Sequence, residues 1–156
     1  MKTLIPALIV SFLLFLDQVT KKLSEGVSLN PEWLMSIQST INTGSSFGLM
    51  SSFPYYNQII SVLSILLLCF LIFKKKELFK EYKYGTWLFI FALAGIGGNL
   101  IDRLFLFGVR DFIALKYLFT FNLADFYLTI TGIILLLEIG SENKNIKRKN
   151  PEKQKK

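Results

Sequence analysis

Two aspartates, Asp111 and Asp125, are the residues of this sequence best suited to acid–base chemistry. Asp125 lies in the stretch FNLADFYL, three residues after Asn122, and the next charged residue is Glu138. A charged aspartate in hydrocarbon costs about 2.5–3.5 kcal/mol on insertion scales, so it usually marks a function or a specific partner. Asp111 precedes Asp125 by fourteen residues, in GVRDFI. That separation allows the chain to fold back and bring the two carboxyl groups together.

Two carboxyl groups within a few ångströms of each other cannot both ionise easily, so one pKa rises, the other falls and the pair shares a proton. One carboxylate then draws a proton from water while the other donates a proton to a carbonyl oxygen, as in aspartic proteases. The sequence has no histidine, which removes imidazole as a base or metal ligand. Its single cysteine, Cys69, lies in the apolar stretch SVLSILLLCFLIF and is expected to pack or to face lipid.

Four apolar blocks are available to position these residues, at about 3–19, 57–73, 85–101 and 117–137. Each is long enough for a helix to cross about 30 Å of hydrocarbon. The sequence is 52% hydrophobic and 19% charged, with a mean hydropathy of +0.46. The first block has no small-residue cleavage site after it, which favours a spanning helix over a signal peptide. We therefore predict an all-α polytopic membrane protein, with one domain at 1–140 and a basic tail at 141–156.

The distribution of lysine and arginine predicts the orientation. With the N-terminus inside, the inside segments (1–2, 74–83 and the tail from 140) hold thirteen basic residues and the two outside loops hold five. This positive-inside bias places both termini in the cytoplasm. The tail supplies much of the net charge of +7 and is expected to contact anionic lipid headgroups. A nucleic-acid partner is not expected, because no aromatic residues interleave with the lysines.

With this topology, the strongly polar residues of the membrane region gather at the outer boundary, and the inner halves of the helices are almost entirely apolar. Asp17 and Lys21 are spaced i, i+4 and can form an ion pair. The outward end of the third block, GIGGNLIDR, places Asn99, Asp102 and Arg103 on one helix face. Its glycines, at 95, 97 and 98, predict a close contact with another helix.

Some of these residues also have a purely structural interpretation. The pairs Asp17–Lys21 and Asp102–Arg103 could fix helix ends against each other, and NTGSSFG (42–48) could be only a turn. Asp125 has no basic neighbour in the sequence, which favours a functional role for it.

Five stretches, taken together, resemble one family. They are DQVTK (17–21), NTGSSFG (42–48), GIGGNLIDR (95–103), GVRDFI (108–113) and FNLAD (121–125). In this order, on four spans, they resemble the lipoprotein signal peptidases (signal peptidase II), which are aspartic peptidases of the bacterial inner membrane. Each stretch alone is weak, but the set is specific. In NTGSSFG two serines stand where the family often has alanines, and the basic tail lies outside the resemblance.

The resemblance implies a role for each matching residue. Asp111 and Asp125 would be the catalytic pair. Support for the pair and the substrate would come from Asn99, Asp102, Arg103 and Asn122, while Asn42 and Gly44 would contact the peptide near the cut. Asp17 and Lys21 would hold the outer end of the first helix.

The same resemblance implies the substrate, the location and the surface platform of the enzyme. The substrate would be a lipoprotein precursor, cut just before a diacylglyceryl-modified cysteine. From their position alone, aromatic residues such as Phe112, Phe121 and Phe126 are expected to line the path of its acyl chains. The enzyme would be a monomer in the bacterial inner membrane, with its active site at the outer face and with no metal or organic cofactor. The first outer loop, about 23–56, would form a small β-rich platform, in which SIQSTIN (36–42) alternates as a strand does.

Three other classes of protein remain open from the residues alone. A transporter or channel would also use intramembrane carboxylates, but its polar residues should continue to the other face. A metal-dependent phosphotransferase could hold Mg²⁺ with clustered aspartates, and a chelator would then abolish its activity. A structural membrane subunit would tolerate Asp125→Asn with only a loss of stability.

Overall fold

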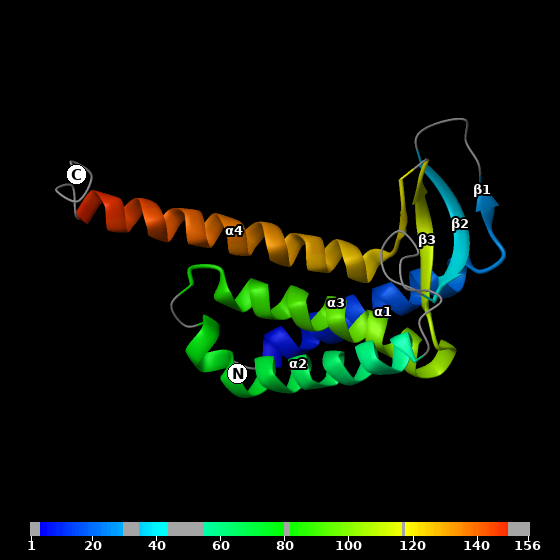
Figure 1. The fold of residues 1–156 in the computed structure, drawn as a ribbon, viewed down its shortest axis with the longest axis horizontal. Helices are drawn as coiled ribbons and strands as arrows, with labels where there is room; N and C mark the ends of the chain where they lie inside the picture. The colour runs from blue at the N-terminus through cyan, green and yellow to red at the C-terminus, as the bar shows by residue number, and fades with distance from the viewer. Residues whose placement is uncertain (1–3, 30–34, 44–54, 80–81, 117, 150–156) are drawn as a thin grey trace.

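In the residues that the computed structural model describes (4–29, 35–43, 55–79, 82–116 and 118–149), the chain forms four α-helices. They are α1 (Leu4–Ser24), α2 (Tyr56–Phe79), α3 (Gly85–Leu106) and α4 (Leu123–Lys149). All four are long and apolar enough to cross a membrane, in agreement with the four predicted spans. α1 begins and α4 ends at the end of the bundle opposite the sheet (Figure 1).

The fourth predicted span, 117–137, is wrong at its start, because α4 begins at Leu123. The side chain of Asn122 accepts a hydrogen bond from the backbone N–H of Asp125 at 3.0 Å, and the Asp125 carboxylate accepts one from the Asn122 N–H at 3.3 Å. This reciprocal cap starts the helix. The preceding Thr120–Phe121 forms a strand instead. At its other end α4 continues past the predicted boundary at residue 141.

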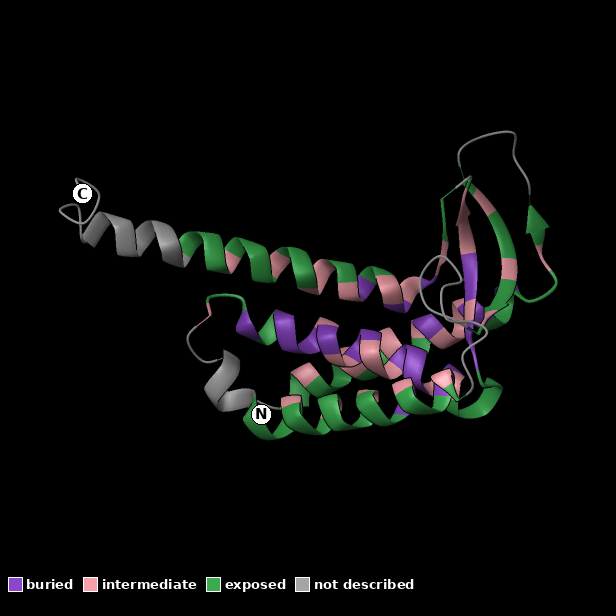
Figure 2. Cartoon of the chain, in the orientation of Figure 1, coloured by how far each residue is buried: buried purple, intermediate pink, exposed green. Residues whose placement is uncertain are grey.

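α3 is the central helix, and it packs against α1, α2 and α4. Figure 2 shows buried residues along most of its length, whereas α2 is mostly exposed. A Cβ atom on Gly95 would lie 2.6 Å from the Leu128 side chain, and one on Gly98 would lie 2.6 Å from Asp17 Oδ2. The predicted close contact at these glycines is confirmed, because any larger residue would push α3 away from α1 and α4.

A small antiparallel sheet stands across the ends of the helices (Figure 1). Its strands run in the order β1 (Ser28–Leu29), β2 (Met35–Asn42), β3 (Val109–Leu115) and β4 (Thr120–Phe121). The predicted strand at 36–42 is confirmed by β2. The prediction that the platform comes from the 23–56 segment is only half correct, because β3 and β4 belong to the connection between α3 and α4.

β2 and β3 pair with Thr40 opposite Asp111 and Ile37 opposite Ile113, with an irregularity between these two pairs. α3 ends and α4 begins beside the sheet (Figure 1), so the connection between them runs alongside β2. The pairing of β2 with β3 therefore places Asp111, from the second half of the chain, against Thr40 from the first half.

Candidate active site

The two candidate catalytic carboxylates lie where β3 meets the first turn of α4. Asp111 projects from β3, and its Oδ1 accepts a hydrogen bond from Asn122 Nδ2 at 2.7 Å. Its Oδ2 accepts one from Asn42 Nδ2, at 2.9 Å, across the β2–β3 pair. Since the backbone N–H of Asn122 donates to Asp125 Oδ2, Asn122 contacts both carboxylates. The structure therefore brings the two predicted aspartates together through hydrogen bonds to one asparagine.

Asn99 holds Asp125 from α3. Its Nδ2 donates to Asp125 Oδ1 at 2.7 Å, while its Oδ1 accepts hydrogen bonds from Asn122 Nδ2 at 3.1 Å and from Lys21 Nζ at 3.2 Å. An ammonium group has only donors, so the oxygen of Asn99 faces Lys21 and its nitrogen is directed at Asp125.

The environment of Asp111 favours its protonated form. The residue is only 2% exposed, and this burial raises the pKa of its carboxyl group to about 6. The hydrogen bonds from Asn42 and Asn122 lower that pKa, while the charge of Asp125 raises it. Arg103 on α3 lies close enough for its charge to interact with both carboxylates. The result is a carboxyl group that can hold a proton near neutral pH.

A buried network of ion pairs adjoins the carboxylates through Asn99. Lys21 Nζ is 2.9 Å from Asp17 Oδ2 and 3.3 Å from Asp102 Oδ2, and all three side chains are completely buried. The predicted Asp17–Lys21 pair is confirmed. Lys21 also donates to the carbonyl oxygen of Gly98 at 3.4 Å, so its charge is balanced on several sides, as a buried ammonium requires.

Asp17 also joins α1 to the start of α4. Its Oδ1 accepts a hydrogen bond from the backbone N–H of Ala124 at 2.8 Å, a group that has no partner within the helix. A negative charge at a helix N-terminus is favourable. Asp17 therefore fixes the turn from which Asp125 projects, although it lies more than a hundred residues earlier in the sequence.

Asp102 pairs with Arg110 and not with Arg103, which corrects the sequence interpretation. Its Oδ1 is 2.7 Å from Arg110 Nη2, and its Oδ2 accepts the backbone N–H of Arg110 at 2.9 Å. Arg110 also donates to Gln18 at 2.8 Å and to Glu25 at 3.0 Å. The hydrogen bond with Asp102 raises the pKa of Arg110. Arg110 thus ties β3 to α1 and α3, one residue before Asp111.

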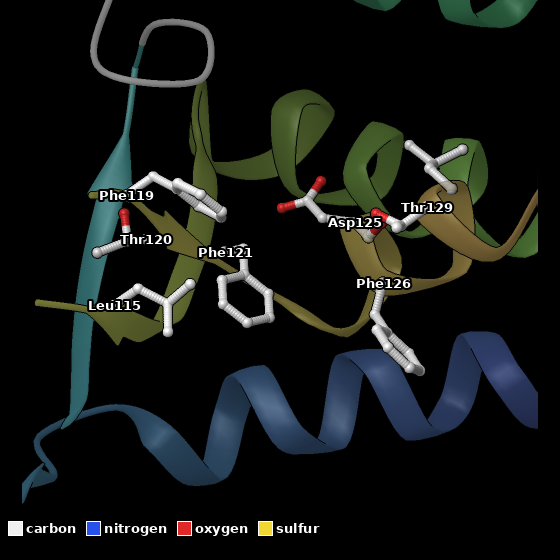
Figure 3. A pocket seen from close by; sticks show the side chains of 8 residues that line it. Leu115, Phe119, Thr120, Phe121, Asp125, Phe126 and Thr129 are labelled. Carbon is white, nitrogen blue, oxygen red and sulfur yellow. Dashed lines mark hydrogen bonds between the residues drawn. The ribbon is translucent and has the colours of Figure 1, made fainter. Parts of the chain in front are cut away.

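An apolar pocket of about 470 Å³ opens beside Asp125, between the β3–β4 hairpin and α4. Figure 3 shows the Asp125 carboxylate directed from α4 towards the strands, with the rings of Phe119 and Phe121 on the strand side and Phe126 on the helix side. Phe121 and Phe126 belong to the predicted acyl path. Phe112 lines a second apolar pocket, of about 410 Å³, with Leu29, Met35, Ser36, Ile37 and Ile113.

The structure gathers most of the predicted site residues into one cluster. Those it brings together are Asp17, Lys21, Asn42, Asn99, Asp102, Arg103, Asp111, Asn122 and Asp125. Gly44 lies outside the described residues. In the described part of the chain, no three histidine, cysteine or acidic side chains are arranged to hold a metal ion.

Sequence reasoning missed three residues of this region. Gln18 and Arg110 belong to the ion network, and the buried Asn57, at the start of α2, donates to the carbonyl oxygen of Thr43 at 2.8 Å. Reading GVRDFIAL as a strand would have placed Arg110 and Asp111 on opposite faces. It would thereby have directed Arg110 away from the two candidate carboxylates and towards the helices.

Four span-length helices with a buried polar cluster at one end define a multi-pass membrane protein. The family model described as signal peptidase (SPase) II matches residues 9–140, and the chain belongs to this family. Lipoprotein signal peptidases of Caldicellulosiruptor bescii and Dehalococcoides mccartyi are 34% and 36% identical to it. The alignments cover 86% of this chain and 91% of the first relative, and 79% of this chain and 79% of the second.

Two solved structures share the fold. One, a bacterial membrane enzyme determined by the in meso method at 2.3 Å resolution, is similar with a TM-score of 0.74 and 26% identity over 90% of both chains. A second bacterial membrane enzyme, at 1.9 Å resolution, has a TM-score of 0.67 and 25% identity, over 86% of this chain and 91% of its own. The fold is therefore that of a known group of membrane enzymes.

Proposed function

We propose that this protein is an intramembrane aspartic endopeptidase that removes signal peptides from lipid-modified lipoprotein precursors, cutting just before the diacylglyceryl-modified cysteine. The observation that carries the proposal is the joining of Asp111 and Asp125 through Asn122, at a site open to an apolar pocket. Membership of the signal peptidase II family supports the same reaction. The enzyme would need no metal ion, because the two carboxyl groups themselves activate water.

In this mechanism Asp111 holds the shared proton and Asp125 is ionised. Asp125 takes a proton from a water molecule while the water oxygen attacks the scissile carbonyl carbon, and Asp111 protonates the carbonyl oxygen. The resulting diol collapses as the C–N bond breaks, with the proton of Asp125 passing to the leaving nitrogen and Asp111 recovering its own. The pKa of about 6 for Asp111 suits a group that must donate and recover a proton.

The neighbouring polar residues would hold the pair and the peptide. The amides of Asn42, Asn99 and Asn122 orient the two carboxylates through the hydrogen bonds described above. Arg103 is half-buried beside the pair, and its Nε has no hydrogen-bond partner among the described residues. We assign Arg103 to a backbone carbonyl of the substrate, and Gly44 to the peptide near the cut.

The lipid part of the substrate would enter through the apolar pocket. Its wall includes Asp125 together with Phe121, Phe126 and Leu128, so an acyl chain in this pocket would lie next to the carboxylate that activates water. The positive-inside bias supports cytoplasmic termini. The sheet end would then face the outside of the inner membrane, where the peptide of an exported precursor is found.

The test is a gel-shift cleavage assay on purified protein in detergent. A lipoprotein precursor, with and without the diacylglyceryl group, is incubated with wild type, Asp111→Asn and Asp125→Asn. We expect cleavage of the lipidated precursor only, loss of at least a hundredfold in each variant, and no effect of a chelator.

Substantial turnover by either folded variant would refute the catalytic pair. Inhibition by a chelator would favour a metal-dependent reaction instead. Failure of folded wild type to cut a precursor that a known signal peptidase II cuts would refute the proposed function itself.

A further inference from the structure

We infer that Lys21, a residue with an evident structural role, is also a positioning residue that sets the working pH of the Asp111–Asp125 pair. The inference rests on the proposed function and extends it to a residue that touches neither the substrate nor the two carboxylates. Three observations carry it: the burial of Lys21, its hydrogen bond to Asn99, and the short path from its ammonium group to Asp111.

The first observation is a contrast between neighbouring lysines on α1. The side chain of Lys21 is 0% exposed, whereas that of Lys22 is 74% exposed and pairs with Glu25 at the surface. Two carboxylates, Asp17 and Asp102, lie within 3.3 Å of Lys21 Nζ. Burying an ammonium group costs free energy, and yet Lys21 is completely buried among the polar residues of the candidate site.

The second observation is the direction of the Asn99 amide. Lys21 Nζ and Asn122 Nδ2 both donate to Asn99 Oδ1, which leaves Asn99 Nδ2 to donate to Asp125. Without the ammonium group, the amide of Asn99 would lose one of the two donors that hold its oxygen. Lys21 therefore orients, through Asn99, the hydrogen bond that Asp125 accepts.

The third observation is electrostatic. Lys21 Nζ, Asn99 Oδ1, Asn122 Nδ2 and Asp111 Oδ1 are linked by distances of 3.2, 3.1 and 2.7 Å, so Nζ lies within about 9 Å of the Asp111 carboxylate. The charge of Lys21 lowers the pKa of Asp111. Among the described residues, the charges of Asp125 from α4 and Arg103 from α3 also act on this carboxyl group.

Removing the Lys21 charge should therefore raise the pKa of Asp111, because the ionised form loses a nearby cation. Asp111 would then keep its proton to higher pH, and the basic limb of the pH–rate profile would move upward. A unit charge at this distance, with an effective dielectric constant of about 20, shifts a pKa by about one unit.

The experiment measures kcat/KM against pH for Lys21→Met, Lys21→Gln and the matched control Lys22→Met, with the lipidated precursor as substrate. We expect the basic limb to rise by about half to one pH unit in both Lys21 variants and to stay in place in Lys22→Met. Lys21→Gln keeps donors for Asp17 and Asn99, so it is the variant expected to remain folded if Lys21→Met does not.

A double-variant cycle tests the route through Asn99. Because Lys21 acts partly through this amide, Lys21→Gln should lower kcat further in the wild-type background than in an Asn99→Ala background. A purely structural role would lower the amount of folded enzyme without moving the limb. An unmoved limb in a folded, active Lys21 variant would overturn the inference, whereas absence of cleavage by wild type would overturn the proposed function.

Discussion

Replacing Asp17 by alanine should lower the free energy of unfolding by about 3–5 kcal/mol, the range for removing one partner of a buried ion pair. The variant leaves Lys21, which is completely buried, without its nearest counter-ion at 2.9 Å. It also leaves the backbone N–H of Ala124 without the acceptor that now lies 2.8 Å away. The remaining contact of Lys21 with Asp102, at 3.3 Å, places the expected loss towards the lower end of that range.

Asp17→Asn separates these two contributions. Its amide oxygen can still accept the Ala124 N–H, so it should be more stable than the alanine variant by about 1 kcal/mol, the usual value of a helix N-terminal cap. Asp17→Asn should keep most of its turnover per folded molecule, because its amide oxygen can still hold the turn from which Asp125 projects. Asp17→Ala leaves the Ala124 N–H without this acceptor and should lose more turnover. The matched control is Glu25→Gln, which removes the charge that pairs with Lys22 and Arg110 at the surface. It should change stability much less than either Asp17 variant, because ion pairs of an exposed carboxylate contribute little.

Unfolding should be followed by circular dichroism during titration with a denaturing detergent. A thiol-reactive dye is unsuitable, since Cys69 is already exposed in the folded protein. Cleavage of the lipidated precursor is then measured per folded molecule. Loss of turnover with unchanged unfolding would refute the structural role of Asp17, and a stability loss no greater than that of Glu25→Gln would refute the importance of the buried pair.

Three further outcomes are expected. Gly98→Ala should destabilise the protein by about 1–3 kcal/mol in the same titration, because its Cβ would lie 2.6 Å from Asp17 Oδ2; Gly132→Ala, which meets nothing within 4 Å, should be neutral or slightly stabilising. The kcat/KM of wild type should fall above an apparent pKa near 6 as Asp111 loses its proton; a profile flat from pH 5 to 8 would contradict that role. Truncation after about Asn143 should spare cleavage by inserted protein, and inactivity of such protein would show that the tail is needed for cleavage.

The apolar blocks predict the helices well because a membrane span needs a long continuous run of apolar residues, which is visible in sequence. Strands are harder to detect. The stretch VRDFIAL of β3 does not alternate cleanly, because both Arg110 and its neighbour Asp111 have polar partners. Arg110 pairs with Gln18 of α1 and Asp102 of α3, and Asp111 accepts hydrogen bonds from Asn42 and Asn122. The run before Asn122 is apolar enough to continue a helix, and only the cap at that residue shows where α4 starts.

The sequence predicts most of the residues that form the candidate site, but it does not predict which of them pair with one another. Spacing along one helix correctly pairs Asp17 with Lys21, since both lie on the same face. Adjacency in sequence suggests Arg103 for Asp102, but the chain turns after α3 and returns Arg110 to the same carboxylate. Contacts of that kind depend on tertiary structure, and no local pattern encodes them.

The pairing of β2 with β3 has a consequence for the order in which the protein is made. Asn42 and Asp111 are 69 residues apart in sequence, and Asp17 and Ala124 are 107 apart. Contacts of such separation form late, after the intervening chain has been synthesised and inserted. A nascent chain in which only the first three helices have been synthesised still lacks Asp125 and the start of α4. The pair of carboxyl groups is thus brought together near the end of biosynthesis, and a chain that is still being synthesised lacks the assembled polar cluster.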